Sequence, residues 1–131
     1  MAETACGNDG RWHVLFNVRF YEARDGSSPI VAFLEDLRTT DPKLHKLLVA
    51  GMVKLRDGSR HGLPLTDQVD TRNDIFELRV GKKDIARAFF FFRRGREIIV
   101  TNGYVKKTQK VDRGELKKAR TFKADWEERF P

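Results

Sequence analysis

The chain has 131 residues, of which 40% are hydrophobic and 34% are charged. This composition is typical of a folded domain with one core and excludes a disordered chain. The net charge of +7 predicts a polyanionic partner, with RNA or DNA ahead of an acidic membrane surface.

The beginning of the chain is polar and lacks the basic start and apolar centre of a signal peptide. No apolar run is long enough to span a bilayer. The single cysteine, Cys6, can form no intrachain disulfide and cannot start a cysteine-based metal site. We therefore expect a reduced, cytoplasmic protein that uses no metal or other cofactor.

Residues 1–11 are small and polar, and we predict a disordered tail there, followed by a single domain over residues 12–131. Residues 12–21 are rich in Val, Phe and Tyr. They predict a first strand that ends before the turn at Asp25 and Gly26.

Two helices are predicted next. Ser28 is suited to cap a helix with Pro29 at its first position, and Asp41 with Pro42 repeats this signal. Gly58 is predicted to end the second helix. Apolar residues follow each start at helical spacing: Ile30, Phe33, Leu34 and Leu37, then Leu44, Leu47, Leu48, Gly51 and Leu55. Such a helical hairpin needs a sheet to cover its apolar side.

The second half of the chain predicts a loop, three strands and a closing helix. Residues 59–73 contain Gly, Pro and several polar residues and predict the loop. Residues 75–80, 85–92 and 98–105 predict an antiparallel meander, because β-branched and aromatic runs alternate with short glycine-containing links. Residues 112–129 predict the last helix. The predicted fold is therefore α+β, in the order β-α-α-β-β-β-α, with a small and mainly antiparallel sheet.

The positive charge of the molecule is concentrated on this meander. Residues 79–113 contain eleven Lys and Arg against three Asp and Glu, which is an excess of eight positive charges. Because the whole chain carries +7, the remainder is close to neutral. A local basic surface on a sheet predicts a site for a polyanion.

Two arginines lie inside the apolar strands. A guanidinium group cannot be left unpaired in a core, so Arg87 either meets a carboxylate such as Glu77 or faces an open, wet concavity. Arg79 presents the same choice one strand earlier. A plain four-residue link pairing Val80 with Ile85 would place the two arginines on opposite faces, whereas a bulge or an odd-length link would bring them together.

Three further patterns have alternative interpretations. Phe89 to Phe92 predict a central strand covered on both faces, although one or two of these rings could border a nucleic-acid surface. The segment 104–110 carries three lysines and no acid. It is either a solvated basic turn or a surface for a polyanion, in which crowding could lower the pKa of one lysine enough for it to accept a proton. The three histidines form no metal or nucleophile constellation, but His61 is a candidate for the rim of the basic sheet.

Several short segments occur in a fixed order: Ser28-Pro29, Phe33-Leu34-Glu35-Asp36-Leu37, Gly62-Leu63-Pro64-Leu65, Phe76-Glu77-Leu78-Arg79, Ala86-Arg87-Ala88-Phe89-Phe90-Phe91 and Gly103-Tyr104-Val105-Lys106-Lys107-Thr108-Gln109-Lys110. This set resembles the phage-derived, HigB-like branch of the RelE/ParE toxin superfamily, from about Trp12 to Ala119. The chain departs from that branch at Val111-Asp112, where the family usually has Thr-Pro, and in its longer N-terminal tail.

The resemblance implies a toxin of a bacterial toxin–antitoxin pair. Such toxins are typically ribosome-dependent mRNA endonucleases, inhibited by an antitoxin that often carries a helix-turn-helix. It implies that Arg79 and Arg87 hold the scissile phosphate and that Lys106 and Lys107 are the other catalytic residues. The resemblance also implies that Tyr104, Gln109 and Lys110 line the rim of the site and bind RNA. Lys82 and Lys83 are further candidate RNA-binding residues.

The expected reaction is metal-independent RNA cleavage, with Arg87 as the first and Arg79 as the second ligand of the phosphorane. On this interpretation Arg87→Ala lowers cleavage at least tenfold, or about 1.4 kcal/mol. Two alternatives remain open: a ParE-like, non-nuclease inhibitor of DNA gyrase, and an inactive nucleic-acid-binding module.

Overall fold

The computed structural model describes residues 3–6, 12–106 and 110–131, without the side chains of residues 3–6, 12 and 13. Its elements are, in chain order, β1 (Glu3–Cys6), β2 (Trp12–Leu15), β3 (Asn17–Phe20), α1 (Pro29–Thr40), α2 (Pro42–Lys54), the 3-10 turn η1 (Gly58–Arg60), β4 (Thr66–Asp70), β5 (Ile75–Val80), β6 (Ile85–Arg93), β7 (Glu97–Lys106) and α3 (Arg113–Arg129). The predicted α+β class is confirmed.

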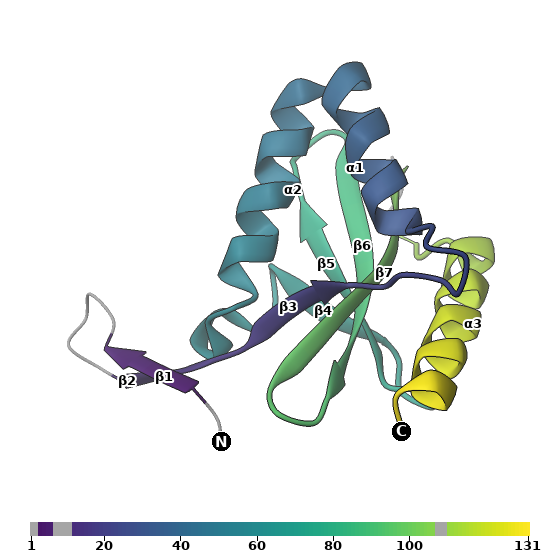
Figure 1. The fold of residues 1–131 in the computed structure, drawn as a ribbon. Helices are drawn as coiled ribbons and strands as arrows, with labels where there is room; N and C mark the ends of the chain where they lie inside the picture. Colours follow the sequence, from purple (N-terminus) through teal and green to yellow (C-terminus); the bar gives the residue numbers. More distant parts are fainter. Residues whose placement is uncertain (1–2, 7–11, 107–109) are drawn as a thin grey trace.

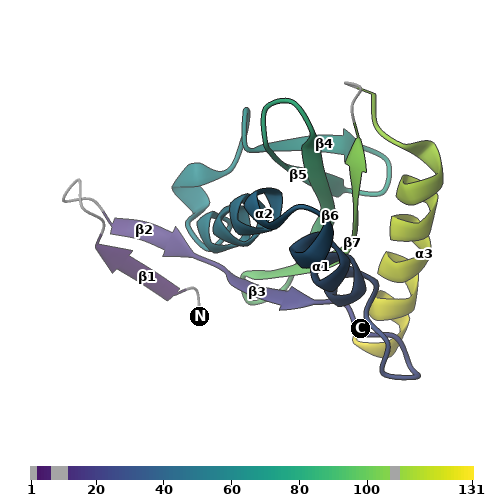
Figure 2. The ribbon, with the colours of Figure 1, turned by 90° about the horizontal axis from the view of Figure 1, so that it is seen from above.

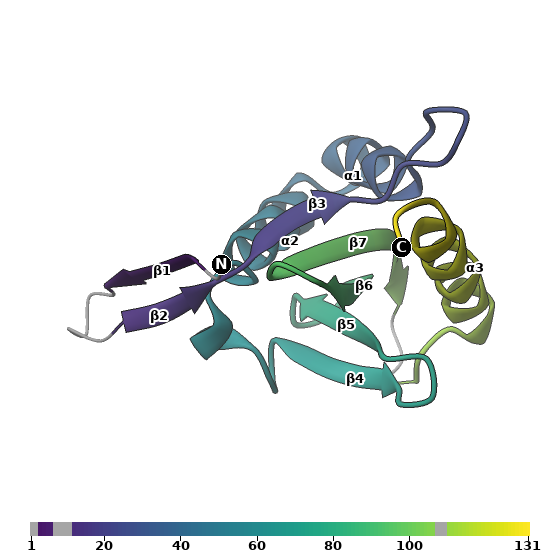
Figure 3. The same ribbon diagram turned by 60° about the horizontal axis from the view of Figure 1, so that its bottom comes forward.

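The main sheet has five strands in the order β3-β7-β6-β5-β4 (Figure 1). All neighbouring strands are antiparallel except β3 and β7, which run parallel. The helices α1 and α2 cover one face of this sheet and α3 packs on the other, as Figures 2 and 3 show from two further directions. The predicted meander is therefore the centre of a three-layer arrangement.

The two predicted helix starts are confirmed. The Ser28 hydroxyl accepts a hydrogen bond from the N–H of Val31, and the Asp41 carboxylate accepts one from the N–H of Leu44. Each helix begins with a proline, which has no N–H to leave unpaired there. The second helix ends at Lys54, earlier than predicted, and Gly58 instead begins η1.

The first predicted strand is two strands that belong to different sheets. β2 pairs with β1, whereas β3 pairs with β7, and the change of partner falls at Phe16. The N–H of Phe16 donates to the carbonyl oxygen of Arg56 at 2.7 Å, and the N–H of Asn17 donates to the carbonyl oxygen of Arg96 at 2.8 Å. These two bonds replace the sheet ladder where the chain changes partner.

Two predictions about irregular segments are wrong. Residues 3–6 of the predicted tail form β1, which pairs antiparallel with β2, because backbone groups can form a ladder whatever the side chains are. Residues 66–70 of the predicted loop form β4, which pairs with β5 at the edge of the main sheet. An edge strand needs no continuous apolar pattern, and the residues of β4 that are buried, Thr66 and Asp70, are polar.

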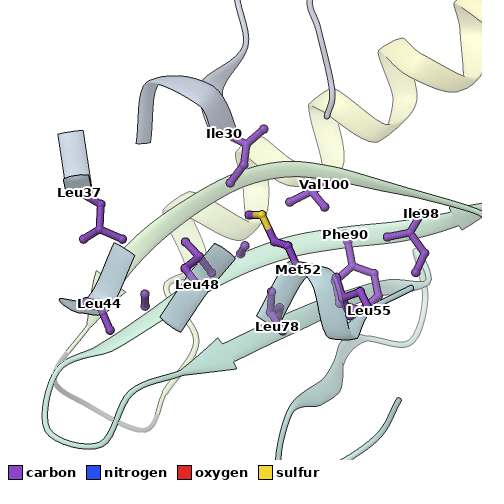
Figure 4. Close-up of a cluster of buried hydrophobic side chains, with 12 residues drawn as sticks. Ile30, Leu37, Leu44, Leu48, Met52, Leu55, Leu78, Phe90, Ile98 and Val100 are labelled. Atoms are coloured by element: carbon purple, nitrogen blue, oxygen red, sulfur yellow. The ribbon is translucent and has the colours of Figure 1, made fainter. Parts of the chain in front are cut away.

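The largest apolar cluster fills the space between the helical hairpin and the sheet (Figure 4). From the helices it contains Ile30, Leu37, Leu44, Leu48, Met52 and Leu55, and from the strands Leu78, Ala86, Ala88, Phe90, Ile98 and Val100. Leu47, predicted as part of this stripe, is half exposed. Phe89, Phe90 and Phe91 are all buried, which confirms that β6 is covered on both faces.

The helix α1 approaches β7 closely at Gly103. A Cβ atom placed there would lie 2.5 Å from a ring carbon of Phe33 and 2.8 Å from the carbonyl oxygen of Arg87. Real Cβ contacts are not this short, so this position accepts only glycine without a shift of the helix or of the strand. Gly103 therefore fixes how deeply the helical layer sits on the sheet.

Candidate functional site

The link between β5 and β6 has an odd length. Val80 pairs with Ala86, so five residues, Gly81–Ile85, connect the paired positions. As a result Arg79 lies directly opposite Arg87, on the same face of the sheet. The sequence left this point open, and the structure decides it in favour of a shared location.

One buried carboxylate holds both arginines. Oε1 of Glu77 accepts hydrogen bonds from Nε of Arg79 at 2.8 Å and from Nη1 of Arg87 at 3.0 Å. Glu77 is fully buried and Arg87 is only 2% exposed, whereas the side chain of Arg79 is 27% exposed. A buried charge needs such partners, because leaving it unpaired costs several kcal/mol.

The other oxygen of Glu77 connects this pair to the last helix. Tyr104 donates its hydroxyl hydrogen to Oε2 of Glu77 at 3.0 Å, and the same hydroxyl oxygen accepts the N–H of Asp112 at 3.0 Å. Asp112 is the N-cap of α3 and accepts the N–H of Glu115. Burial, followed by the neighbouring charge of Glu77, raises the pKa of Tyr104 to about 12.

We call Glu77, Arg79, Arg87 and Tyr104 the Glu77 network. Within it Arg79 is the arginine that reaches solvent. Its Nη2 donates to Asp67 at 2.9 Å, so the guanidinium is fixed by two carboxylates on adjacent strands. Of the described residues, none accepts a hydrogen bond from Nη1 of Arg79.

The predicted lysines lie around this network. Lys106 ends β7 on the same face as Tyr104, and its Nζ is 4.0 Å from the carboxylate of Asp112. Lys82 and Lys83 are exposed in the link between β5 and β6, and Lys110 is exposed before α3. Lys107 and Gln109 lie outside the described residues.

The structure places two predicted site residues in the interior. Tyr104, expected at a rim, is buried and serves the Glu77 network. Arg87, expected to hold a phosphate, is enclosed beside Glu77. The burial of Tyr104 and of Arg87 follows from the register of β5, β6 and β7. This register puts the two side chains beneath the surface that Arg79 and Lys106 reach.

A hollow of about 640 Å³ adjoins Arg79 between α2 and residues 59–65. Lys54 and Arg60 also line it, and the residues that line it include no Asp or Glu. His61 also lines it, and its Nε2 lies 2.8 Å from the carbonyl oxygen of Leu55. The surroundings of Arg79 are therefore cationic on this side as well.

Asp67 and Asp112 belong to the site but were not anticipated. Asp67 lies in the unpredicted β4, so sequence gave no reason to place it beside Arg79. Asp112 was recognised only as the start of the last helix. The usable signal was the spacing of Glu77 and Arg79, because side chains two residues apart in a strand share a face.

Two features are absent from the described part of the chain. Its His, Cys, Asp and Glu side chains include no group of three placed to hold a metal ion. Among the same residues, no helix combines the length and the apolar character that crossing a bilayer requires.

Comparison with known families identifies the class of protein. Residues 35–123 match the family described as Phage derived protein Gp49-like (DUF891). The match covers more than half of the chain, so the chain belongs to the Gp49-like family, a family of RelE/HigB-like toxins associated with toxin–antitoxin systems. A cognate antitoxin is therefore its implied partner. A search of curated proteins found no match.

Proposed function

We propose that this toxin is a ribosome-dependent mRNA endonuclease that inhibits translation by cutting mRNA without a metal ion. The observation that carries the proposal is Arg79, a solvent-accessible guanidinium held rigidly by Glu77 and Asp67 on a basic sheet. No described residue accepts a hydrogen bond from its Nη1, whose N–H groups can donate a charge-assisted hydrogen bond to a phosphate oxygen. Membership of a toxin family supports the same assignment.

In the proposed reaction the ribose 2′-hydroxyl attacks the adjacent phosphorus. The 2′-hydroxyl gives up its proton to solvent as the O2′–P bond forms. The P–O5′ bond breaks and the leaving 5′-oxygen takes up a proton from solvent, which leaves a 2′,3′-cyclic phosphate and a 5′-hydroxyl. Arg79 balances the additional negative charge of the phosphorane, and Lys106, two residues beyond Tyr104 on β7, binds a neighbouring phosphate oxygen. Arg87 acts through Glu77 and positions Arg79. Alignment of the mRNA by the ribosome supplies much of the acceleration.

The remaining predicted residues complete this proposal. Lys82, Lys83 and Lys110 bind flanking phosphates through their exposed ammonium groups. Lys107 and Gln109 keep the roles that the resemblance implies. The antitoxin, which we propose carries a helix-turn-helix, inhibits by covering the basic face.

The test is to add the purified toxin to translating ribosomes and to map the 5′ ends of the mRNA. We expect new ends within reading frames, each with a 5′-hydroxyl, and none when the same mRNA is incubated without ribosomes. Intact mRNA in both reactions, with toxicity retained in cells, would contradict the nuclease.

Burial of Arg87 favours a second candidate, a non-nuclease inhibitor of DNA gyrase, because one of the two expected phosphate ligands is enclosed. This candidate predicts that the toxin inhibits supercoiling by purified gyrase and leaves mRNA on ribosomes intact.

A further inference from the structure

A second group of cations lies at the opposite end of the sheet from Arg79. Arg94 and Arg96 belong to the turn between β6 and β7, and Arg56 follows α2. All three side chains are exposed. Arg96 contacts the ring of Phe16, and Arg56 and Arg94 line one hollow together with Phe16. We call Arg56, Arg94 and Arg96 the Phe16 arginine cluster.

The backbone fixes two members of this cluster beside Phe16. The carbonyl of Arg56 accepts the N–H of Phe16, and the carbonyl of Arg96 accepts the N–H of Asn17. The guanidinium carbon of Arg96 lies 5.3 Å from the centre of the Phe16 ring, within the range of a cation–π contact. The place where the chain changes from β2 to β3 thus also positions these arginines.

The cluster borders a hollow of about 380 Å³, lined by Leu15, Phe16, Asn17, Arg56, Arg94, Gly95 and Glu97. The acid in this lining is already paired, because Glu97 accepts a hydrogen bond from Arg19 at 2.9 Å. Asp57, next to Arg56, accepts hydrogen bonds from the N–H and the hydroxyl of Ser59. The hollow therefore keeps a net positive charge.

Several other arginines of this protein pair with carboxylates. Arg24 and Arg129 pair with Asp125, Arg93 with Glu127, and Arg120 with Asp70. Among the side chains that the structure describes, no carboxylate forms an ion pair with any member of the Phe16 arginine cluster. Three neighbouring like charges repel one another, and binding a polyanion removes this repulsion.

The cluster is separate from the proposed cleavage site. Arg87 and Arg93 are six residues apart on β6, which at about 3.3 Å per residue is about 20 Å. Figure 1 shows the two turns at opposite ends of β6. A phosphate bound at Arg79 cannot also contact the cluster.

We propose that the Phe16 arginine cluster is a second RNA-binding surface, which binds the phosphodiester backbone and anchors the toxin on the ribosome. This inference rests on the proposed function, since RNA is taken as the target. Guanidinium groups suit phosphate oxygens, and the partly buried ring of Phe16 offers apolar contact to a ribose or a base edge. The backbone is that of ribosomal RNA, and binding of the mRNA outside the cleavage site is the alternative that the test separates.

The test measures binding instead of cleavage, so it is independent of the nuclease assignment. Fluorescently labelled toxin is titrated, over a range of salt concentrations, with ribosomes that lack mRNA and with a single-stranded RNA oligonucleotide. The variants are Arg94→Ala combined with Arg96→Ala, Arg94→Lys combined with Arg96→Lys, and Arg72→Ala as a control in the exposed turn between β4 and β5. Thermal melting checks that each variant is folded.

We expect the double alanine variant to bind ribosomes about tenfold more weakly near 0.1 M salt, with a salt slope about 1.5 shallower. The lysine variant should keep most of the affinity and Arg72→Ala nearly all of it. If the double alanine variant binds only the ribosomes more weakly, the cluster recognises ribosomal RNA. If it binds both the ribosomes and the oligonucleotide more weakly, the cluster recognises RNA backbone in general.

Two results would overturn the proposal. One is unchanged binding to both RNA ligands, including the case in which only the affinity for the antitoxin falls, since that identifies a protein-binding surface. The other is an equal loss for Arg72→Ala, since that reflects only total charge. If the double alanine variant loses binding and the unaltered toxin does not cleave mRNA, the proposed nuclease activity is contradicted, whereas the proposal of an RNA-binding surface is supported.

Discussion

Arg79 and Arg87 lie directly opposite each other on β5 and β6, and both donate to the same oxygen of Glu77. Two adjacent guanidinium groups would otherwise repel one another inside the protein. The shared carboxylate cancels this repulsion and leaves one arginine enclosed and the other at the surface. The two therefore have different roles, and substitutions should separate them.

Arg87→Ala should lower stability more than any substitution of Arg79. It leaves the fully buried Glu77 with fewer partners and removes a large buried side chain, which together cost about 3–5 kcal/mol of unfolding free energy. Urea titration measures this cost, with Arg79→Ala as the matched control at about 1 kcal/mol. If the Arg87→Ala protein were folded and as stable as the unaltered protein but did not cleave mRNA, Arg87 would have to be a phosphate ligand.

Tyr104→Phe should weaken the connection between the sheet and α3. It removes the hydroxyl that bonds both Glu77 and the N–H of Asp112, at a cost of about 1–3 kcal/mol. The substitution also changes the alkaline limit of stability. The pKa of Tyr104 is about 12 in the folded protein against 10.0 as its ordinary value, so its contribution is complete below pH 10 and disappears towards pH 12.

Thermal melts between pH 8 and pH 12 check the alkaline effect. Tyr21, whose pKa burial and the hydrogen bond to Asp125 also raise to about 12, provides the comparison through Tyr21→Phe. The melting temperature of the unaltered protein should fall above pH 10, and in each variant it should fall less. Identical pH profiles for Tyr104→Phe and the unaltered protein would show that the hydroxyl is not held by Glu77.

The helices and the central meander were predictable because their signals are local. Ser28-Pro29 and Asp41-Pro42 mark helix starts within two residues, and the runs that became β5, β6 and β7 carry their own pattern. The strand β4 was missed because an edge strand with polar buried residues has no such pattern. The Glu77 network was only partly predictable, since one residue of link length decides the face on which Arg87 lies.

Asp70→Asn should remove an acid-sensitive connection between β4 and α3. Burial acts to raise the pKa of Asp70, but hydrogen bonds from Arg120 and Asn73 outweigh it and lower the pKa to about 2. The carboxylate therefore stabilises the fold fully above about pH 4, and this contribution disappears as the pH falls towards 2.

The expected cost of Asp70→Asn at pH 7 is about 1.5–3 kcal/mol, as for other hydrogen bonds to charged groups. Urea titration at pH 7 and at pH 2.5 measures it, and the difference between the two proteins should shrink at the lower pH. A difference that is the same at both values would mean that the ion pair with Arg120 does not stabilise the fold.

Gly103→Ala should destabilise the protein by about 1–3 kcal/mol, because the new methyl group meets the Phe33 ring and the Arg87 carbonyl. Gly103→Ala combined with Phe33→Leu should recover part of this loss, since a smaller side chain leaves room. Thermal melting compares the two variants. Equal stability of Gly103→Ala and the unaltered protein would contradict the close packing of α1 on β7.

The central claim is that Arg79 holds the scissile phosphate, and cleavage of mRNA on the ribosome by Arg79→Ala tests it most directly. With Arg72→Ala as the control, mapping of mRNA 5′ ends should show cleavage lowered at least tenfold for Arg79→Ala, or about 1.4 kcal/mol of transition-state stabilisation. The melting temperature should fall by only a few degrees, as expected for a loss of about 1 kcal/mol. Cleavage by folded Arg79→Ala at the rate of the control would contradict the claim.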